Sequence, residues 1–259
     1  MLLVVTRPAA QAAAWVDGLR ALGCAAQSLP LIEIAPAADP APVLAAWQRL
    51  DGYALAMFVS ANAVQQFFSL ASPAASWPAR VRAGATGPGT TAALREAGVP
   101  ALAIVEPPAL GGNFDSEALW ARLADEDWQS ERVLVVRGPD GRDWFAETMR
   151  SRGARVDFVV AYQRLEPRLN ESEQALLRLA QAEPAAHLWH FSSSEAVVRL
   201  QRLTPHADWS RSSALASHPR IAAAARSAGF GRVELVDPGA LSSVARAVAA
   251  WPSIQSLPS

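Results

Sequence analysis

The stretch VLVVRGPDGRDWFAETMRSRGARVDFVVAYQR, Val133 to Arg164, begins with a continuous apolar run and passes directly into a loop with two glycines and two arginines. The N-terminal stretch LLVVTRPAAQAAAWVDGLRALGCAAQSLPLIEIAP, Leu2 to Pro36, has the same layout. In each stretch a helix-forming segment follows the loop, and a glycine, Gly23 or Gly153, comes before a second apolar segment. Continuous apolar runs that alternate with helical segments predict parallel strands buried on both faces.

The likeness between these two stretches extends along the rest of the chain. Later segments pair in the same order at a nearly constant offset of about 130 positions: Leu3–Pro8 with Leu134–Pro139, Phe58–Val64 with Phe191–Val197, and the segment ending at Val99 with the one ending at Phe230. Solenoid repeats have periods of about 20–50 residues. The sequence therefore predicts one duplicated unit of about 130 residues.

Each copy of the repeat is expected to alternate strands and helices. The apolar runs predict strands at residues 2–5, 26–34, 54–59, 81–85, 133–136, 156–161, 188–191, 213–217 and 233–236. Helices are expected at residues 9–22, 63–70 and 90–97, with Gly23 and Gly98 at their C-terminal ends. This pattern predicts an α/β fold in which two similar domains each contain a parallel sheet flanked by helices.

The composition excludes several classes of chemistry. The chain has 259 residues, a net charge of −1, and 23 basic residues that are all arginine. Without lysine, Schiff-base chemistry, pyridoxal phosphate attachment and a phosphate-loop lysine are excluded. The balanced charge gives no general attraction to nucleic acid or to an anionic membrane.

The sequence also bears on the cellular compartment. Cys24 is the single cysteine, which excludes an internal disulfide and a thiolate metal cluster. The apolar run Leu2–Val5 is too short for a signal peptide, and no run reaches the roughly 18–20 apolar residues needed to span a membrane. We expect a cytoplasmic protein.

Six loops that follow predicted strands carry small polar residues, glycine or arginine. Ligands of open parallel sheets bind at the carboxyl ends of the strands, where helix N-termini offer free N–H groups. Helix caps and turns require the same residue types, so each loop taken alone also fits a structural role. Together the loops predict a surface for a large, multiply anionic ligand, with these candidate contacts: Thr6, Arg7, Ser60, Ala61, Asn62, Gly87, Thr90, Arg137, Gly138, Arg142, Ser192, Ser193, Ser194, His218 and Arg220.

Other sites have less support in the sequence. The segment GATGPGT departs from the dinucleotide-binding glycine spacing, and there is no G-x-S-x-G motif. The four histidines lack metal-ligand spacing, so no metal site is expected, and His187 and His190 fit a buried strand better. Tyr162 is expected at the end of a strand, and both a buried core role and a site role remain open for it.

The ordered motifs VVTRP, PLIEI, FVSANAV, GPGTTAAL, FDSEALWARL, RGPDGR, AYQR, FSSSEAV and HPRIA resemble the uroporphyrinogen-III synthase family, most of all its bacterial form. The resemblance covers residues 2 to about 248. It implies one domain formed by residues 1–35 and 167–259 and a second formed by residues 36–166. A two-stranded linker would join the domains, with the crossings near Pro36 and Pro167 and the active site in the cleft between the domains.

The resemblance also implies an activity in tetrapyrrole biosynthesis. Members of the family close hydroxymethylbilane, a linear tetrapyrrole, with loss of water and inversion of ring D, and they use no metal or organic cofactor. It implies that Tyr162 assists departure of the hydroxyl group and that Ser60, Thr90 and the Ser192–Ser194 run line the cleft. Arg220 replaces a threonine found in some members. We further expect a monomer, with a transient contact to hydroxymethylbilane synthase at most.

Two functions of other classes fit the same residues. A two-lobed protein could bind an anionic small molecule without catalysis, because the sequence shows no acid–base pair. A nucleotide-dependent transferase is disfavoured by the missing phosphate-loop lysine and the missing acidic metal ligands.

Overall fold

The computed structural model describes residues 1–73, 75–108, 115–237 and 240–251. Contacts between Cα atoms divide the chain into unit 1, Met1–Glu33 with Leu165–Ser259, and unit 2, Ile34–Arg164. The boundaries that the family resemblance implies, after residues 35 and 166, lie two residues further along the chain. We propose that these units are the two expected domains.

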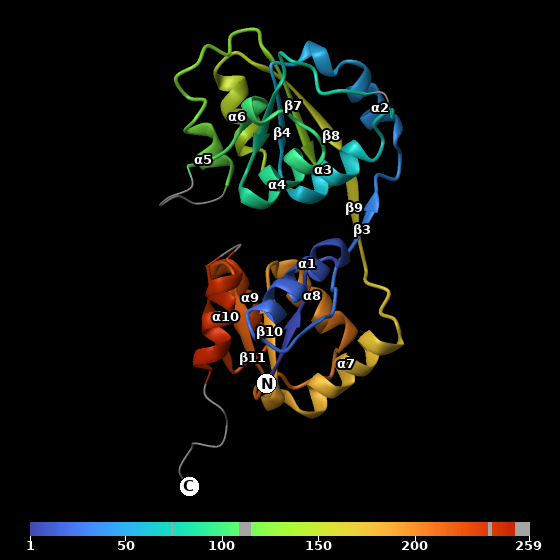
Figure 1. Ribbon diagram of the computed structural model, residues 1–259, viewed down its shortest axis with the longest axis vertical. Helices are drawn as coiled ribbons and strands as arrows, with labels where there is room; N and C mark the ends of the chain where they lie inside the picture. The colour runs from blue at the N-terminus through green and yellow to red at the C-terminus, as the bar shows by residue number, and fades with distance from the viewer. Residues whose placement is uncertain (74, 109–114, 238–239, 252–259) are drawn as a thin grey trace. The chain divides into compact units, whose positions relative to one another are not determined.

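Unit 1 is built on a parallel sheet (Figure 1). In the described residues of this unit the strand order is β12-β11-β10-β1-β2. The strands are β1 (Leu2–Val5), β2 (Ala26–Ser28), β10 (His187–Phe191), β11 (Ser213–Ala216) and β12 (Arg232–Leu235). The helices are α1 (Ala9–Ala21), α7 (Glu171–Ala182), α8 (Ser194–Leu203), α9 (Pro219–Ser227) and α10 (Leu241–Ala250), with a short 3₁₀ turn, η3 (Pro184–Ala186). Helix α1 packs beside α10, and α8 packs beside α9.

Unit 2 has a second parallel sheet, with the order β6-β5-β4-β7-β8 in the part of the chain that the structure describes. Its strands are β4 (Leu55–Phe58), β5 (Arg82–Ala85), β6 (Ile104–Val105), β7 (Arg132–Arg137) and β8 (Arg155–Val160). Its helices are α2 (Ala41–Gln48), α3 (Ala61–Phe68), α4 (Pro88–Glu96), α5 (Ser116–Trp120) and α6 (Trp144–Ser151), with 3₁₀ turns η1 (Leu50–Gly52) and η2 (Ala101–Ala103).

The two sheets have the same topology, and this confirms the predicted fold class. Strand β1 holds the place in unit 1 that β7 holds in unit 2, and β10 corresponds in the same way to β4. The sequence repeat aligns the same strands with each other, β1 with β7 and β4 with β10. Each unit nevertheless contains strands from both copies, because β1 pairs with β10 in unit 1 and β4 pairs with β7 in unit 2. Strands β3 (Glu33–Pro36) and β9 (Tyr162–Leu165) form the two-stranded linker.

The sheet of unit 2 is apolar on both faces. Ala56 and Phe58 of β4 belong to one buried cluster, together with residues of α3 and α4. Leu55 and Met57 belong to a second cluster, with residues of α5 and α6. Successive side chains of a strand point to opposite faces, so a strand covered on both sides must be apolar throughout. This is why the apolar runs located the central strands.

The structure corrects two expectations at the linker. The strand expected at residues 26–34 is interrupted between Ser28 and Glu33, where Pro30 has no N–H to donate to a ladder. Tyr162 begins β9 and does not end the preceding strand. The helix ends expected at Gly23 and Gly98 are confirmed, since both residues have positive φ angles, +83° and +84°.

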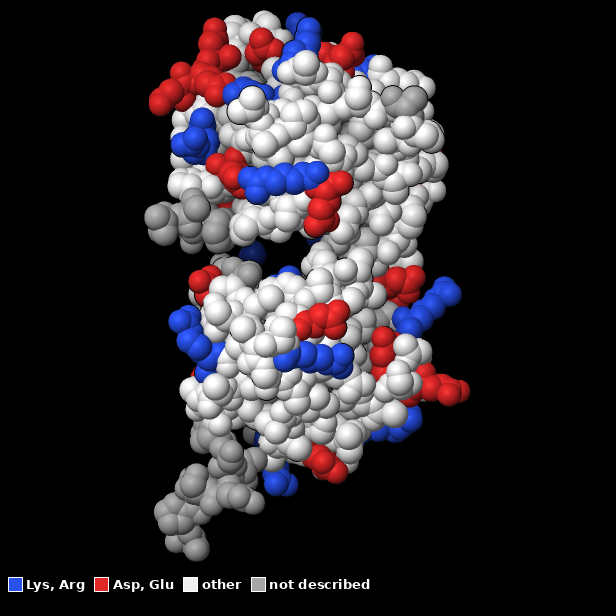
Figure 2. All heavy atoms as spheres, in the orientation of Figure 1, with Lys and Arg blue, Asp and Glu red and all other residues white. Residues whose placement is uncertain are grey.

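Many surface arginines are paired with carboxylates. Examples are Arg82 with Glu126 at 2.6 Å and Arg202 with Glu166 at 2.9 Å. Figure 2 shows the two signs interspersed on the visible face, in keeping with the net charge of −1. Among the described residues, no helix is both long and apolar enough to cross a membrane.

A buried tyrosine links β7 and β8 of unit 2 and makes stability depend on pH. The Tyr53 hydroxyl donates to Asp157 at 2.7 Å, and Arg132 donates to the same carboxylate at 2.7 Å. Burial, and then the hydrogen bond to Asp157, raises the pKa of Tyr53 from 10.0 to about 12. The folded protein therefore holds this proton more tightly than the unfolded chain does.

We expect the stabilisation from Tyr53 to be fully present below about pH 10 and to be lost as the pH rises through about 12. Urea unfolding of the wild type and of Tyr53→Phe, at several pH values across this range, measures it. The difference in unfolding free energy between the two proteins should shrink as the pH rises. A difference that stays constant from pH 9 to pH 12 would contradict the expectation.

Candidate functional site

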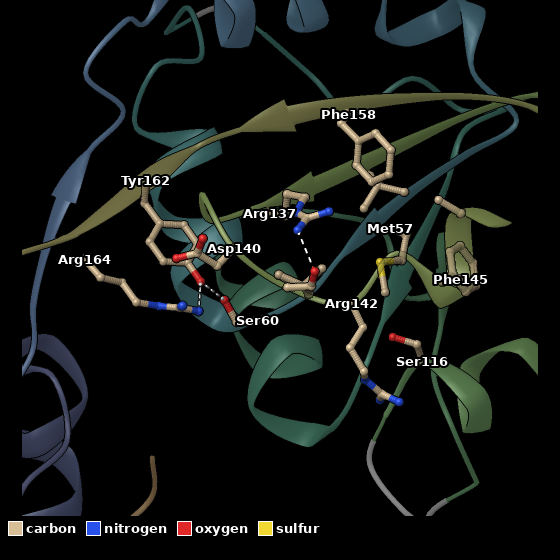
Figure 3. Close-up of a pocket in the computed structure, with 14 residues that line it drawn as sticks. Met57, Ser60, Ser116, Arg137, Asp140, Arg142, Phe145, Phe158, Tyr162 and Arg164 are labelled. Carbon is tan, nitrogen blue, oxygen red and sulfur yellow. Dashed lines mark hydrogen bonds between the residues drawn. The ribbon is translucent and has the colours of Figure 1, made fainter. Parts of the chain in front are cut away.

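Unit 2 contains a cavity of about 200 Å³ beside the carboxyl ends of its central strands (Figure 3). The strands β4, β7 and β8 and the linker strand β9 contribute to its wall, together with the loop after β7. Its lining residues are Met57, Val59, Ser60, Ser116, Val135, Arg137, Asp140, Gly141, Arg142, Phe145, Ala146, Phe158, Tyr162 and Arg164. Four of the residues predicted from the sequence are among them: Ser60, Arg137, Arg142 and Tyr162.

The Tyr162 hydroxyl lies between two polar side chains in this cavity (Figure 3). Nη2 of Arg164 donates to the phenol oxygen at 3.2 Å. Oγ of Ser60 lies 3.4 Å from the same oxygen. Because Arg164 donates, the phenol keeps its own hydrogen for Ser60 or for a bound ligand. The ring itself is 1% exposed, so the hydroxyl is held in a fixed place.

Ser60 is held in position by the helix that follows it. As the N-cap of α3, its Oγ accepts a hydrogen bond from the Ala63 backbone N–H at 3.2 Å. Ser60 therefore has the helix-capping role that the sequence allowed for each of these loops. The same oxygen still lies within reach of Tyr162, so the two roles coexist in this residue.

Gly138 allows the chain to pass close to the Tyr162 ring. A Cβ atom at this position would lie 2.9 Å from Cζ and 3.1 Å from the hydroxyl oxygen of Tyr162. Gly138 follows Arg137, whose guanidinium forms an ion pair with Asp143 and donates to the Gly141 carbonyl at 3.0 Å. Arg137 thus holds the loop after β7 in place beside the cavity.

Arg142, from the same loop, forms a two-pronged ion pair with Glu117 of α5, at 2.6 and 3.1 Å. The hydrogen bond from Arg142 holds the pKa of Glu117 below its usual value. Such exposed pairs contribute little to stability. An incoming carboxylate can therefore compete for the Arg142 guanidinium.

An aromatic wall completes the cavity, and the sequence analysis missed it. Its aromatic side chain is Phe158 of β8, the last strand in the order of the sheet, and Phe158 is 37% exposed. The guanidinium carbons of Arg137 and Arg150 lie 5.2 and 5.3 Å from its ring centroid. Arg164 was also missed. Its spacing of two from Tyr162 in a strand places both side chains on one face, and this signal could have identified it.

The other residues predicted in unit 2 do not line this cavity. Ala61 and Asn62 are the first residues of α3, and Gly87 is the N-cap of α4. Thr90 is 5% exposed within α4, where its backbone N–H donates to the Gly87 carbonyl at 3.0 Å. Since β4, β5 and β7 are neighbours in a parallel sheet, these residues still lie at the same sheet edge as the cavity.

In unit 1 the predicted residues gather at the carboxyl ends of β1, β10 and β11, which are neighbours in the sheet. Thr6 is buried, and its hydroxyl donates to the His190 carbonyl at 2.8 Å. Ser193 caps α8 and His218 caps α9, through hydrogen bonds from the backbone N–H groups of Glu195 and Arg220. The remaining predicted residues lie in the same loops and helix starts: Arg7, Ser192, Ser194 and Arg220.

The described residues contain no group of three or more histidine, cysteine or acidic side chains arranged to hold a metal ion. The polar groups of the cavity are three arginines, a phenol, an aspartate and two serines. Guanidinium groups bind carboxylates in two-pronged fashion, and a phenol can donate a proton or a hydrogen bond to a departing oxygen. The geometry is therefore suited to a carboxylated ligand, with the phenol in place as a proton or hydrogen-bond donor.

Comparisons with known proteins identify relatives along most of the chain. The family model described as uroporphyrinogen-III synthase HemD matches residues 13–238. A uroporphyrinogen-III synthase of Salmonella typhimurium is 29% identical over 92% of this chain and 95% of its own length. The Escherichia coli enzyme of the same name is 32% identical over 68% of this chain and 70% of its own length.

Solved structures agree in fold. The uroporphyrinogen-III synthetase of Helicobacter pylori has a TM-score of 0.59 at 14% identity, over 96% of this chain and 99% of that one. A mutant uroporphyrinogen III synthase of Thermus thermophilus has a TM-score of 0.54 at 18% identity, over 96% and 97%. These identities support the fold alone, whereas the family match extends over most of the sequence. The chain belongs to the uroporphyrinogen-III synthase family.

Proposed function

We propose that this protein converts hydroxymethylbilane to uroporphyrinogen III, with loss of water and inversion of ring D, in tetrapyrrole biosynthesis. The observation that carries the proposal is the family match over residues 13–238. The cavity supports it, because a phenol and three guanidiniums meet there beside an aromatic wall. The sequence relatives from Salmonella and Escherichia carry the same enzyme name.

The substrate is a polyanion, since each of its four pyrroles carries an acetate and a propionate arm. Pockets that enclose a drug-sized ligand measure about 300–1,000 Å³. The cavity, at about 200 Å³, is smaller, so we propose that it encloses one end of the tetrapyrrole. Arg137, Arg142 and Arg164 would meet carboxylate arms there, and Arg142 would exchange Glu117 for the substrate.

Tyr162 is the catalytic residue in this proposal. Loss of the hydroxyl group from the substrate gives an electrophilic azafulvene, and this step is assisted when a proton donor faces the departing oxygen. The Tyr162 hydroxyl suits that role because Arg164 donates to it, which strengthens the phenol as a donor in turn. Ser60, 3.4 Å away, can accept the phenol hydrogen before the substrate binds.

After ionisation, the outcome depends on which carbon of ring D reaches the electrophile. Attack by the substituted carbon, through a spiro intermediate, gives inversion. Holding reactants in one geometry can contribute ~7–11 kcal/mol to a reaction. We therefore propose that the arginines and the rigid loops contribute more than proton transfer does, and that no metal or organic cofactor takes part.

The remaining predicted residues are proposed as further substrate contacts. In unit 2 these are Ala61, Asn62, Gly87, Thr90 and Gly138. In unit 1 they are Thr6, Arg7, Ser192, Ser193, Ser194, His218 and Arg220. Backbone N–H groups at the starts of the helices and arginine side chains would meet the carboxylates. The monomeric state, the cytoplasmic location and the transient contact with hydroxymethylbilane synthase stay predictions. Sedimentation of this protein alone, and mixed with hydroxymethylbilane synthase, in analytical ultracentrifugation tests the monomeric state and the contact.

One assay tests the proposed function against a binding protein without catalysis. Freshly made hydroxymethylbilane is added to the purified protein, and the oxidised products are separated by chromatography. We expect the type III isomer. Spontaneous closure gives the type I isomer, so type I alone, with the substrate otherwise retained on the protein, would favour the binding protein.

Phe158 should contribute to substrate binding more than to the rate of the chemical step. An aromatic stack contributes about 0.5–1.5 kcal/mol beyond its buried area, so we expect Phe158→Ala to raise KM roughly 2- to 12-fold. Val160→Ala is the matched control, because Val160 is 40% exposed on the same strand and does not line the cavity. Steady-state kinetics of both variants measure the effect, and equal KM values for the two would contradict it.

A further inference from the structure

Unit 1 contains an arginine, Arg7, that has no carboxylate partner among the residues that the structure describes. Arg7 follows β1, and its guanidinium carbon lies 3.7 Å from the centroid of the Trp15 ring, which belongs to α1. Its Nε atom is buried and has no hydrogen-bond partner among the described residues. Burial lowers the pKa of Arg7 to about 10, which still leaves the side chain charged at neutral pH. A partly buried charge without a counter-charge is costly.

The repeat supplies a comparison inside the same chain. In unit 2 the repeat aligns Gly138 with Arg7, and the residue just before it, Arg137, ends β7 and forms an ion pair with Asp143 of its own loop. The segment after Arg7 reads PAAQAAAW and contains no acidic residue. The loop of unit 2 therefore neutralises its own arginine, whereas the loop of unit 1 leaves the charge of Arg7 available to an external anion.

The start of α1 adds positive potential beside Arg7. This helix has 13 residues, its N-cap is Pro8, and it has neither a side-chain cap nor an acidic residue in its first turn. The first N–H groups of such a helix point outward without partners and carry a partial positive charge. Anions bind at places of this kind.

His190 is the second unusual polar group of this cluster. Its ring is 0% exposed and stacks on Trp15, with centroids 5.2 Å apart and an angle of 15° between the planes. Neither ring nitrogen has a hydrogen-bond partner in the described part of the chain. Burial, and then the nearby charge of Arg7, lowers the pKa of His190 to about 3, so the imidazole is neutral at physiological pH. Arg7 is thus the charged member of the cluster.

We propose that Arg7, Trp15 and the first turn of α1 form a carboxylate-binding site in unit 1, with the buried His190 ring supporting the indole. Stacking on Trp15 holds the guanidinium plane, whose N–H groups can grip both oxygens of a carboxylate. The ligand is an acetate or propionate arm of the tetrapyrrole, and this identification rests on the proposed function. The hydrogen bond from Thr6 to the His190 carbonyl fixes the loop that carries Arg7.

The test measures binding and stability separately from turnover. Arg7→Met removes the charge and keeps an apolar side chain against Trp15. Arg178→Met is the matched control, with the same change of charge on an exposed residue of α7 in unit 1. The probe is uroporphyrin III, the oxidised octacarboxylate product, titrated by calorimetry. Melting temperatures are recorded without the probe.

We expect Arg7→Met to weaken the binding of uroporphyrin III about tenfold or more, because hydrogen bonds to charged groups are lost. Its melting temperature should stay equal or rise, since an unpaired buried charge is removed. Arg178→Met should change neither quantity. Unchanged affinity in Arg7→Met, whatever its melting temperature, would overturn the site.

The outcome of this test is distinct from the outcome for the proposed function. If the wild type forms the type III isomer and Arg7→Met still binds the probe as tightly as the wild type, the site in unit 1 is wrong and the function stands. If the wild type binds the probe through Arg7 but hydroxymethylbilane still closes only to the type I isomer, the carboxylate site stands and the proposed function fails.

Discussion

Tyr162→Phe should lower kcat by about 10- to 100-fold and leave KM nearly unchanged. The substitution removes a single oxygen, which the proposal places opposite the departing hydroxyl group, so the loss falls on the transition state. General acids commonly contribute about 10²–10⁴-fold. We expect the contribution of Tyr162 to be at or below the lower end of this range, because the substrate also ionises and closes without the enzyme. Since spontaneous closure gives type I, the share of type I in the product should rise as well.

The other tyrosine of the chain is a matched control. Tyr53 is also 1% exposed, and its hydroxyl is also hydrogen-bonded, to Asp157 at 2.7 Å, but it does not line the cavity. Tyr53→Phe should therefore cost stability and leave kcat unchanged. The same atom is deleted in both variants. Equal rates for Tyr162→Phe and the wild type would return Tyr162 to a core role.

The sequence predicted the sheets well because buried parallel strands are apolar on both faces. The apolar runs of β1, β4, β7, β10 and β11 marked these strands within a residue or two. Glycines at helix ends were equally clear, since positive φ angles exclude most other residues. The repeat alone, however, suggested two consecutive copies. The exchange of strands between the units came from the family resemblance.

The linker was harder to predict, because its strands are short and only partly buried. PLIEIAP is apolar apart from Glu33, yet Pro30 interrupts the ladder and β3 pairs with a different strand from β2. For the same reason Tyr162, which was expected at the end of one strand, is the first residue of the next strand, β9. Periodicity indicates whether a segment is extended, but it does not identify the partner strand.

The site was predicted only in part, since long side chains reach beyond their own loop. Arg137 was expected as a ligand contact, but its pairing with Asp143 depends on how the loop folds. Phe158 was missed because an exposed aromatic residue looks the same in sequence as a buried one. The stack of Arg7, Trp15 and His190 joins the loop after β1 and helix α1 to β10, a strand far along the chain.

Gly138→Ala should reduce kcat by at least tenfold, although it removes no functional group. The added methyl carbon would lie 2.9 Å from Cζ of Tyr162, a separation that real Cβ contacts do not reach. The ring is 1% exposed and belongs to the main core cluster of unit 2, so it cannot move without disturbing its neighbours. Overpacking of this kind costs about 1–3 kcal/mol of stability.

The loss of activity follows from the displaced hydroxyl. Its distances to Arg164 and Ser60, 3.2 and 3.4 Å, leave little room before both contacts are broken. A misplacement of about 1 Å can cost 10²-fold in rate. Because Gly138→Ala and Tyr162→Phe act on the same hydroxyl, their effects on kcat should not add, and the double variant should be scarcely slower than Tyr162→Phe alone.

Gly89→Ala separates this clash from the general effect of adding a methyl group. Gly89 lies in the first turn of α4, and a Cβ there would have no heavy atom within 4 Å. Alanine favours a helix over glycine by roughly 0.5–1 kcal/mol, so Gly89→Ala should be neutral or slightly stabilising and fully active. Kinetics and urea unfolding of both variants measure the contrast. If Gly138→Ala were as active as Gly89→Ala, the hydroxyl of Tyr162 would not need its present position, and the catalytic assignment would fail with it.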